Sequence, residues 1–231
     1  MILGGFQKLT LIDYPGKIAT TVFTVGCNFR CPFCHNPELV DLRLTHNEES
    51  EKDFFDFLQK RKGKLEGVCI TGGEPTIQPD IIKFIKKIKK EGFCVKLDSN
   101  GTRPDILKKL IDQSLIDYIA MDIKSYPDAY VKVTETESDK DRIRISVDLI
   151  RNSGIDYEFR TTVVPGLHDE KDFVKIAQWL EGSRAYYLQE YREEQKILNP
   201  NLKKKTKGKK INLEKIKKDI EKSFGKVEIR R

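Results

Sequence analysis

The chain has 231 residues, enough for one domain with a substantial buried core, and 34% of them are charged. No stretch approaches the roughly 20 apolar residues that a membrane span needs, and five cysteines, three of them clustered, do not form the paired pattern of a secreted disulfide framework. The formal net charge of +7 suggests nucleic-acid binding as a function, and the distribution of that charge tests the idea.

The first residues do not resemble a targeting segment. Ile2 and Leu3 run directly into Gly4 and Gly5, without a basic region and a long apolar core. Because the cysteine pattern also fits a reducing compartment, we expect a cytoplasmic protein.

Short apolar runs alternate with helical patterns along most of the chain. We expect strands near residues 18–26, 67–71, 93–98, 117–122, 157–164 and 185–190. Apolar spacing of three and four predicts helices marked by Phe54, Phe57 and Leu58, by Ile81, Ile85 and Ile88, by Leu107, Leu110 and Ile111, by Val147 and Ile150, and by Phe173, Ile176, Ala177 and Leu180. Alternating strands and helices form parallel sheets through right-handed crossovers. Six such units predict an α/β fold, a partial (β/α)6 TIM-like barrel.

The pattern changes after residue 190. A charged connection leads to a helix with Asn212 as its N-cap. Its apolar stripe consists of Leu213, Ile216, Ile220 and Phe224. Gly225 is expected to end this helix, and residues 226–230 alternate like an edge strand docked on the barrel. We therefore divide the chain into a barrel over residues 1–195 and a basic connection with a C-terminal helix and strand over residues 196–231.

The positive charge lies in the tail. Residues 200–231 carry 13 Lys or Arg and 4 Asp or Glu, whereas the rest of the chain is slightly negative. The lysine run over residues 203–210 contains no aromatic residue, so it lacks the stacking platforms of a single-strand binder. We expect a solvated flexible loop there and no nucleic-acid partner. A docking surface for an acidic protein or for nucleotide phosphates is the functional alternative.

Three cysteines, Cys27, Cys31 and Cys34, lie within eight residues. Structural zinc sites take four ligands, and ordinary iron–sulfur clusters are held by four cysteines. Three thiolates without a fourth favour a cubane [4Fe–4S] cluster that keeps one iron open for chemistry. Zinc would need His35 or a distant cysteine as its fourth ligand, and no second Cys-x-x-Cys pair follows.

The other two cysteines and one later histidine have simpler interpretations. Cys69 and Cys94 each lie inside an apolar predicted strand, so we expect buried and unreactive thiols. His168 follows a Val-Pro-Gly-Leu run, and we expect it to be a polar residue at a helix entry and not a ligand.

Polar residues gather where the predicted strands end. In parallel barrels the chemistry lies at the carboxyl edge, where each strand meets its following loop. The cysteines follow the first strand, Gly72-Gly73-Glu74-Pro75 the second, Asp98-Ser99-Asn100-Gly101 the third and Asp122-Ile123-Lys124 the fourth, while Arg160 lies along the fifth. All of these groups are predicted to lie on one rim.

The Cys-x3-Cys-x2-Cys spacing, the aromatic Phe33 before its third cysteine and the Gly-Gly-Glu-Pro run together resemble the radical S-adenosylmethionine superfamily. Three further motifs are similar to the activating proteins of anaerobic ribonucleoside-triphosphate reductase, relatives of pyruvate formate-lyase activating enzyme: Gly5-Phe6-Gln7-Lys8, Leu11-Ile12-Asp13-Tyr14-Pro15-Gly16 and Cys34-His35-Asn36. The resemblance extends to the strand near Tyr187 and implies the same partial barrel.

The resemblance implies an anaerobic radical oxidoreductase. Cys27, Cys31 and Cys34 would hold one [4Fe–4S] cluster, whose open iron binds S-adenosylmethionine. One electron then cleaves that cofactor to methionine and a 5′-deoxyadenosyl radical, which abstracts hydrogen from a glycine of a partner glycyl-radical enzyme, here anaerobic ribonucleoside-triphosphate reductase. The electron would come from a reductant such as flavodoxin or ferredoxin, and no membrane partner is expected.

The same resemblance assigns residues around S-adenosylmethionine. Gly72 and Gly73 let the backbone approach its methionyl group, and Glu74 accepts from its ammonium. Phe33 presents an aromatic face near the adenine, although its type also suits a hydrophobic core. The other cofactor contacts are expected from Cys34, His35, Asp98, Asn100, Asp122, Lys124 and Arg160.

Asp122 and Lys124 also suit a weak surface ion pair, judged by residue type alone. We favour the functional interpretation because the strand before them is apolar from Ile116 to Met121, and its polarity begins abruptly at Asp122.

Two departures from the resembled enzymes bear on the target. Residues 35–68 contain no cysteine, so a single cluster is expected. The last barrel strand carries Gln189 where pyruvate formate-lyase activating enzyme has a histidine that touches the cofactor, which argues against that specificity. Two alternatives stay open: a radical enzyme for another glycyl-radical enzyme, a small molecule or tRNA, and a non-catalytic metal-cluster protein that binds nucleic acid through its tail.

Overall fold

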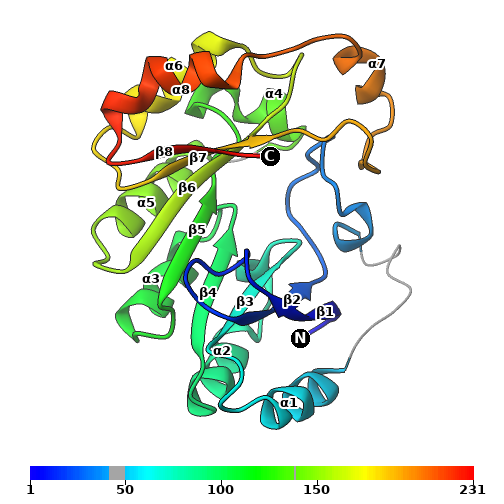
Figure 1. Cartoon of the computed structure of the whole chain (residues 1–231), viewed down its shortest axis with the longest axis vertical. Coiled ribbons are helices and arrows are strands. Elements are labelled where there is room, and N and C mark those ends of the chain that lie inside the picture. Colours follow the sequence, from blue (N-terminus) through cyan, green and yellow to red (C-terminus); the bar gives the residue numbers. More distant parts are fainter. Residues whose placement is uncertain (42–49, 138) are drawn as a thin grey trace.

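A sheet of eight strands organises the computed structural model, which describes residues 1–41, 50–137 and 139–231. The strands are β1 (Leu3–Thr10), β2 (Ala19–Thr24), β3 (Gly67–Gly72), β4 (Cys94–Ser99), β5 (Tyr118–Asp122), β6 (Asp156–Val163), β7 (Tyr186–Glu190) and β8 (Val227–Arg230). Each strand pairs with the next in sequence; β1 and β2 are antiparallel, and all later pairs are parallel. The edges β1 and β8 do not pair with each other in the described ranges, so the barrel is open (Figure 1).

Helices connect the parallel strands and mostly cover the outer face of the curved sheet, whereas α7 lies beyond its end (Figure 1). They are α1 (Glu51–Lys60), α2 (Ile81–Lys90), α3 (Pro104–Asp112), α4 (Tyr130–Thr134), α5 (Lys140–Arg151), α6 (Glu170–Trp179), α7 (Leu202–Thr206) and α8 (Leu213–Ile220). Short 3-10 turns lie at Pro37–Leu39, Pro75–Ile77, Pro127–Ala129 and Glu221–Ser223. No helix in the described part of the chain has the length and apolarity to cross a bilayer. The predicted partial barrel of strand–helix units is confirmed.

The core forms between the sheet and the apolar stripes of these helices. On α2, four residues in the predicted spacing are buried: Ile81, Phe84, Ile85 and Ile88. Each such side chain contributes roughly 1.5–3 kcal/mol by leaving water. The inward face of the sheet is different, because it carries the buried charged residues Lys96, Asp98 and Glu158. The polar interior of the barrel is therefore enclosed by an apolar shell.

The edge strand β1 was not predicted as a strand. Its sequence contains Gly4 and Gly5, a residue type depleted in strands, and several of its other side chains face solvent. The pairing with β2 also shifts register between Leu3 and Gly5. Tertiary pairing with β2 thus overrides a weak local preference.

The C-terminal helix begins as predicted, because the Asn212 side chain accepts from the Lys215 N–H at 3.0 Å. It ends at Ile220, and a 3-10 turn separates it from Gly225, so the expected stop at this glycine is wrong. Strand β8 pairs with β7 as the expected edge strand. The expected loop over the lysine run is also wrong in part, since α7 forms there around the buried Leu202.

The two isolated cysteines differ in burial. Cys69 is fully buried in β3, as expected. Cys94 is the first residue of β4 and is only partly buried, so the expectation of a buried thiol is wrong there.

Gly73 allows the turn after β3 to pack directly on the loop after β2. Its N–H donates to the Thr24 carbonyl at 2.9 Å, and a Cβ added to it would lie 2.1 Å from the Gly26 carbonyl oxygen. We therefore expect Gly73→Ala to lower the free energy of unfolding by about 3 kcal/mol or more, measured by chemical denaturation. Gly154→Ala is the control: with φ +73 but open space, it should cost only about 1 kcal/mol. Equal losses in the two variants would contradict the backbone-contact argument.

Candidate active site

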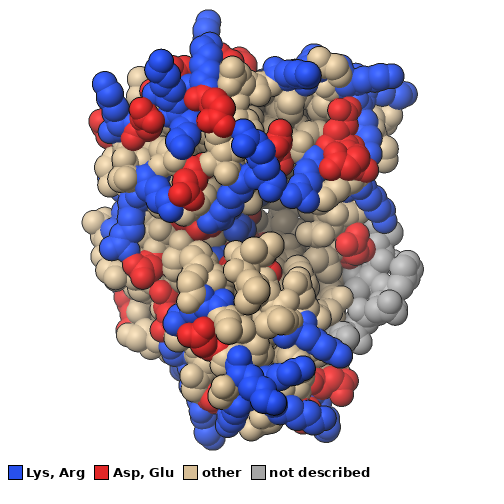
Figure 2. Space-filling model, in the orientation of Figure 1, with Lys and Arg blue, Asp and Glu red and all other residues tan. Residues whose placement is uncertain are grey.

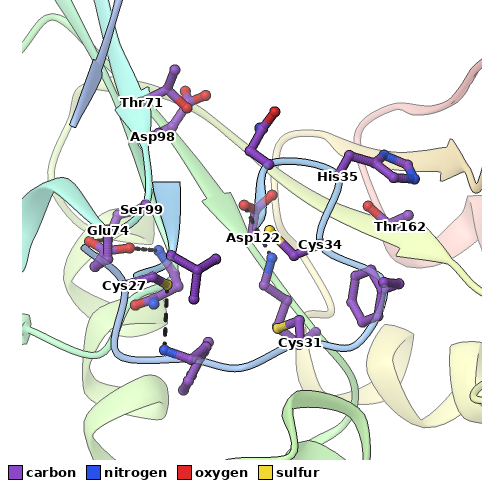
Figure 3. Close-up of a pocket in the computed structure, with 18 of the residues that line it drawn as sticks. Cys27, Cys31, Cys34, His35, Thr71, Glu74, Asp98, Ser99, Asp122 and Thr162 are labelled. Carbon is purple, nitrogen blue, oxygen red and sulfur yellow. Dashed lines mark hydrogen bonds and ion pairs between the residues drawn. The ribbon is translucent and has the colours of Figure 1, made fainter. Parts of the chain in front are cut away.

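One cavity of about 220 Å3 lies at the carboxyl edge of the sheet (Figure 3). All residues predicted for the cluster or the cofactor line it: Cys27, Cys31, Phe33, Cys34, His35, Gly72, Gly73, Glu74, Asp98, Asn100, Asp122, Lys124 and Arg160. Their strands are parallel, so their carboxyl ends meet at this rim. The structure therefore brings together groups that lie up to 133 residues apart in the sequence.

The cysteine loop follows β2 and is fixed by backbone hydrogen bonds. The Gly26 N–H donates to the Leu39 carbonyl at 2.8 Å, and the Cys34 N–H donates to the Cys31 carbonyl at 3.0 Å. Burial raises the pKa of the Cys27 thiol to about 11 and that of Cys31 to about 12. In the metal-free chain these thiols hold their protons at neutral pH, and metal binding must displace them.

The three thiols of the cysteine loop all line this cavity. A [4Fe–4S] cubane takes three thiolates, each at a different iron, and leaves its fourth iron open. Cys69 lies deeper in the barrel, 3.7 Å from Lys96 Nζ, and neither it nor Cys94 lines the cavity. In the described chain, therefore, the cavity holds three thiols and no fourth.

Glu74 joins the ends of β3 and β4. Its Oε1 accepts from the Thr76 N–H at 3.1 Å, from the Thr76 hydroxyl and from Ser99 Oγ at 2.8 Å, and its Oε2 accepts from the Asn100 N–H at 2.6 Å. Burial raises its pKa, and these donors oppose that shift. Oε2 is thus the oxygen with capacity left for a further donor, and the expected contact with a ligand ammonium stays a prediction.

Asn100 is also held by the cysteine loop. Its side-chain amide donates to Asn28 Oδ1 at 2.8 Å, and Asn28 donates in turn to Thr102 Oγ1 at 2.7 Å. The end of β4 is thereby tied to the loop that carries the thiols. Asn28 directly follows Cys27. The cysteine spacing did not predict that this residue would bind the end of β4.

A chain of buried ion pairs crosses the barrel interior below the rim. Arg160 donates from Nε to Asp122 at 2.6 Å and from an Nη atom to Asp98 at 2.9 Å. Lys96 pairs with Asp98 at one end, and Lys124 lies 3.3 Å from Asp122 at the other. The expected alternative of a weak surface pair for Asp122 and Lys124 is wrong, because both side chains are largely buried.

Opposite charges determine the ionisation state of these buried ion-paired residues. Burial alone would raise the pKa of Asp122, but Arg160 and Lys124 hold it well below its usual range. Burial alone would lower the pKa of Lys124, and Asp122 raises it instead. All members stay charged at neutral pH, so the rim offers an ammonium and a guanidinium beside the thiols.

Phe33 and His35 flank Cys34 in the cysteine loop. Phe33 is 6% exposed and lines the cavity, so it serves the core and borders the site at once. The His35 ring stacks on Tyr191, with centroids 5.6 Å apart, and its buried Nε2 has no hydrogen-bond partner among the described residues.

Comparison with known proteins identifies the family. The model of the Radical SAM superfamily matches residues 21–180. The chain belongs to the radical SAM superfamily. A provisionally named glycyl-radical enzyme activating enzyme from Methanocaldococcus jannaschii is 36% identical over 82% of this chain and 80% of its own length. Pyruvate formate-lyase-activating enzyme from Listeria monocytogenes is 33% identical over 76% of this chain and 74% of its own length. This radical SAM chain is therefore an enzyme of the glycyl-radical-activating kind.

Solved structures support the fold of this radical SAM enzyme. A domain of pyruvate-formate lyase-activating enzyme from Bacteroides vulgatus superposes with a TM-score of 0.52 at 18% identity, covering 72% of this chain and 99% of that one. Streptococcus suis SuiB bound to S-adenosylmethionine superposes with a TM-score of 0.65 at 14% identity, covering 90% of this chain and 49% of that one. The chain thus spans about half the length of SuiB. The superfamily uses a [4Fe–4S] cluster and S-adenosylmethionine, and three thiols in one cavity, with no fourth in the described chain, fit that pair of cofactors.

Several residues of the site were missed in the sequence. Thr71 and Thr162 also line the cavity, as do Ser99 and Gln189, which the sequence placed at strand ends without a role at the cofactor. Lys96 and Glu158 are buried charges inside the barrel, and Glu158 pairs with Arg230. A signal existed, because Lys96 alternates with Asp98 on β4, and Glu158 alternates with Arg160 and Thr162 on β6. Period-two polarity on a buried strand marks the inward face of a barrel.

His168 lies just before α6, at the helix entry where it was expected. Its side chain contacts the backbone of the loop that carries Lys124. The Val164 N–H donates to Nδ1 at 3.1 Å, so Nε2 carries the hydrogen and donates to the Lys124 carbonyl at 2.8 Å. Burial lowers its pKa, so the neutral ring is the folded form.

We therefore expect stability to fall as pH drops below about 6.5, where the unfolded chain gains a proton that folded His168 refuses. Denaturation of the wild type and of His168→Gln between pH 8 and pH 5.5 measures this. The variant should lose less stability over that range. His35 is present in both proteins, so only the difference between their plots of unfolding free energy against pH reports on His168. Equal slopes in the two plots would contradict the claim that His168 is neutral in the folded protein.

Proposed function

We propose that this enzyme generates the glycyl radical of anaerobic ribonucleoside-triphosphate reductase. The observation that carries the proposal is the single cavity that holds three thiols and no fourth cysteine in the described chain, within a family of glycyl-radical activators. Cys27, Cys31 and Cys34 would hold one [4Fe–4S] cluster, as their thiolates.

The cluster, when bound, supplies the electron that cleaves S-adenosylmethionine to methionine and a 5′-deoxyadenosyl radical. Lys124 and Arg160 would place positive charge near the carboxylate or ribose of the cofactor, oriented by Asp122 and Asp98. His35, which lines the cavity, would also contact the cofactor. The cysteine loop and the Gly73 turn close the cavity from one side and limit access of water.

Two features support the reductase as target. Residues 35–68 contain no cysteine, which suits an activator with one cluster, and Gln189 occupies the last barrel strand where no histidine is available. Pyruvate formate-lyase remains the second candidate, because activators of that enzyme are among the relatives. In either case the glycine of the partner must reach the cavity, and we place both proteins in the cytoplasm.

The test is radical transfer to a defined partner. The reconstituted enzyme is reduced, supplied with S-adenosylmethionine and mixed with either anaerobic ribonucleoside-triphosphate reductase or pyruvate formate-lyase. A glycyl-radical doublet in the electron paramagnetic resonance spectrum of the reductase alone is the expected result. A doublet only in the lyase would replace the first candidate with the second. Cleavage of S-adenosylmethionine without a glycyl radical in either protein would mean that neither of them is the target.

A further inference from the structure

The segment from residue 192 to residue 210, which we call the basic arm, joins β7 to α8 across the rim of the barrel. It carries eight Lys or Arg and two Glu. Its exposed lysines are Lys204, Lys205, Lys207, Lys209 and Lys210, and none of these forms an ion pair with a described residue. Figure 2 shows positively charged side chains around the α7 region at the upper right, with a group of acidic side chains beside them. Charges without partners on one face attract a protein of opposite charge.

The basic arm is fixed to the cysteine loop. The Leu198 N–H donates to the Cys34 carbonyl at 2.9 Å, and the Asn199 N–H donates to the Pro32 carbonyl at 3.0 Å. Ile197 and Leu202, 4% and 3% exposed, anchor the arm in the core. A protein that binds the arm is therefore held next to the backbone that carries the thiols.

The acidic residues of the region do not cancel its charge. Glu193 and Glu194 are exposed at the start of the arm, and Glu193 makes only a 3.4 Å contact with Thr206 Oγ1. Farther along, Lys209 and Lys210 border a hollow that also contains Asp169 and Glu170, so the charge there is mixed. Positive charge is therefore in excess at α7 and Lys207, where Glu193 is the acidic neighbour with a hydrogen bond to α7.

The basic arm borders the cavity without lining it, because no residue of the arm is among the lining residues in the described chain. A glycine-bearing target must enter the cavity to reach the reacting atoms. A redox partner has a weaker requirement, since it needs only to lie close to the cluster.

We propose that the basic arm is the docking surface for an acidic one-electron donor protein. The inference rests on the proposed function, because it assumes a cluster held by Cys27, Cys31 and Cys34. One electron leaves the donor, which is oxidised, and enters that cluster, which is reduced by the same single electron. The arm supplies long-range attraction and orientation, and the two hydrogen bonds to the cysteine loop fix the distance.

The test uses the reconstituted enzyme and a small acidic ferredoxin as probe. The arm variant combines Lys204→Glu, Lys205→Glu and Lys207→Glu. The matched control combines Lys83→Glu, Lys86→Glu and Lys90→Glu on α2, which are exposed, form no ion pair with a described residue and lie far from α7 (Figure 1). Titration calorimetry measures the binding of oxidised ferredoxin, and stopped-flow absorbance measures reduction of the cluster by reduced ferredoxin.

The arm variant should lose about tenfold or more in both affinity and reduction rate at low salt, and the control variant should stay near the wild type. Rising salt should slow the wild type and leave the arm variant almost unchanged. Equal rates in the arm and control variants, or a salt-independent wild type, would overturn the proposal. A third result would also overturn it: an arm variant that still binds ferredoxin but has lost a salt-dependent binding to single-stranded RNA. That result would make the arm a nucleic-acid-binding surface.

A chemical reductant separates this proposal from the proposed function. With dithionite, all three proteins should reduce their clusters equally and release the same amount of 5′-deoxyadenosine from S-adenosylmethionine. Absence of that product from every protein would contradict the proposed function and leave the binding result standing. A defect of the arm variant with dithionite as well would contradict docking, because it would show damage to the site itself.

Discussion

Replacing Cys31 with alanine is expected to abolish cluster binding and all cleavage of S-adenosylmethionine. Cys31 is the middle thiol of the trio and is 7% exposed, and the cavity in the described chain holds no fourth cysteine to replace it. After anaerobic reconstitution, iron should fall from about four atoms per chain to near zero. 5′-Deoxyadenosine should fall below detection with dithionite as reductant. Iron analysis and chromatography of the products measure both changes.

Cys94→Ala is the control for this variant. Cys94 is partly buried at the start of β4 and does not line the cavity, so its loss should leave iron content and product formation unchanged. The circular dichroism spectrum checks that both variants fold. Full cluster content in the Cys31 variant would contradict the three-thiol assignment. Loss of iron in the Cys94 variant would show that a distant thiol contributes to the site.

The site was largely predictable because its residues are marked by local patterns. The cysteine spacing and the Gly-Gly-Glu-Pro run each lie within eight consecutive residues. The alternation of apolar strands and amphipathic helices then indicates that the strands are parallel. Parallel strands place every strand end on one rim, so Asp98, Asp122 and Arg160 follow from topology alone.

What the sequence left undetermined depends on contacts between distant segments. Strand β1 is held by its pairing with β2 and has a weak strand signal of its own. Helix α7 forms because Leu202 finds a buried position on the rim, which a lysine-rich window does not indicate. Glu74 has four hydrogen bonds from the next strand end and its own turn, so its first role in the structure is to join β3 to β4.

Replacing Arg160 with glutamine is expected to be the most damaging single change to stability within the barrel interior. Arg160 lies between Asp98 and Asp122, and its side chain is 14% exposed. Its removal leaves two buried carboxylates that share only Lys96 and Lys124. Removing one partner of a buried ion pair typically costs about 3–5 kcal/mol. Urea denaturation at pH 7 measures the loss.

Arg103→Gln is the control, because Arg103 also donates two hydrogen bonds to carboxylate oxygens, both of them on Asp105, at 3.0 and 2.8 Å. Its side chain and that of Asp105 are 35% and 43% exposed, so its loss should cost below about 1 kcal/mol. Similar losses in the two variants would show that burial does not determine the strength of the pairs.

The pH dependence separates a lost charge partner from a lost packing contact. In the wild type, Arg160 holds the pKa of Asp122 below its usual range, so this stabilisation is complete above about pH 5 and fades as acid protonates the carboxylate. In Arg160→Gln the buried carboxylates should take up protons at higher pH, which relieves their unpaired charge. The difference in unfolding free energy between wild type and variant should thus shrink between pH 7 and pH 4. A constant difference would mean that Arg160 stabilises the barrel through packing and not through its charge. The ionisation of Asp98 and Asp122 would then depend on Lys96 and Lys124.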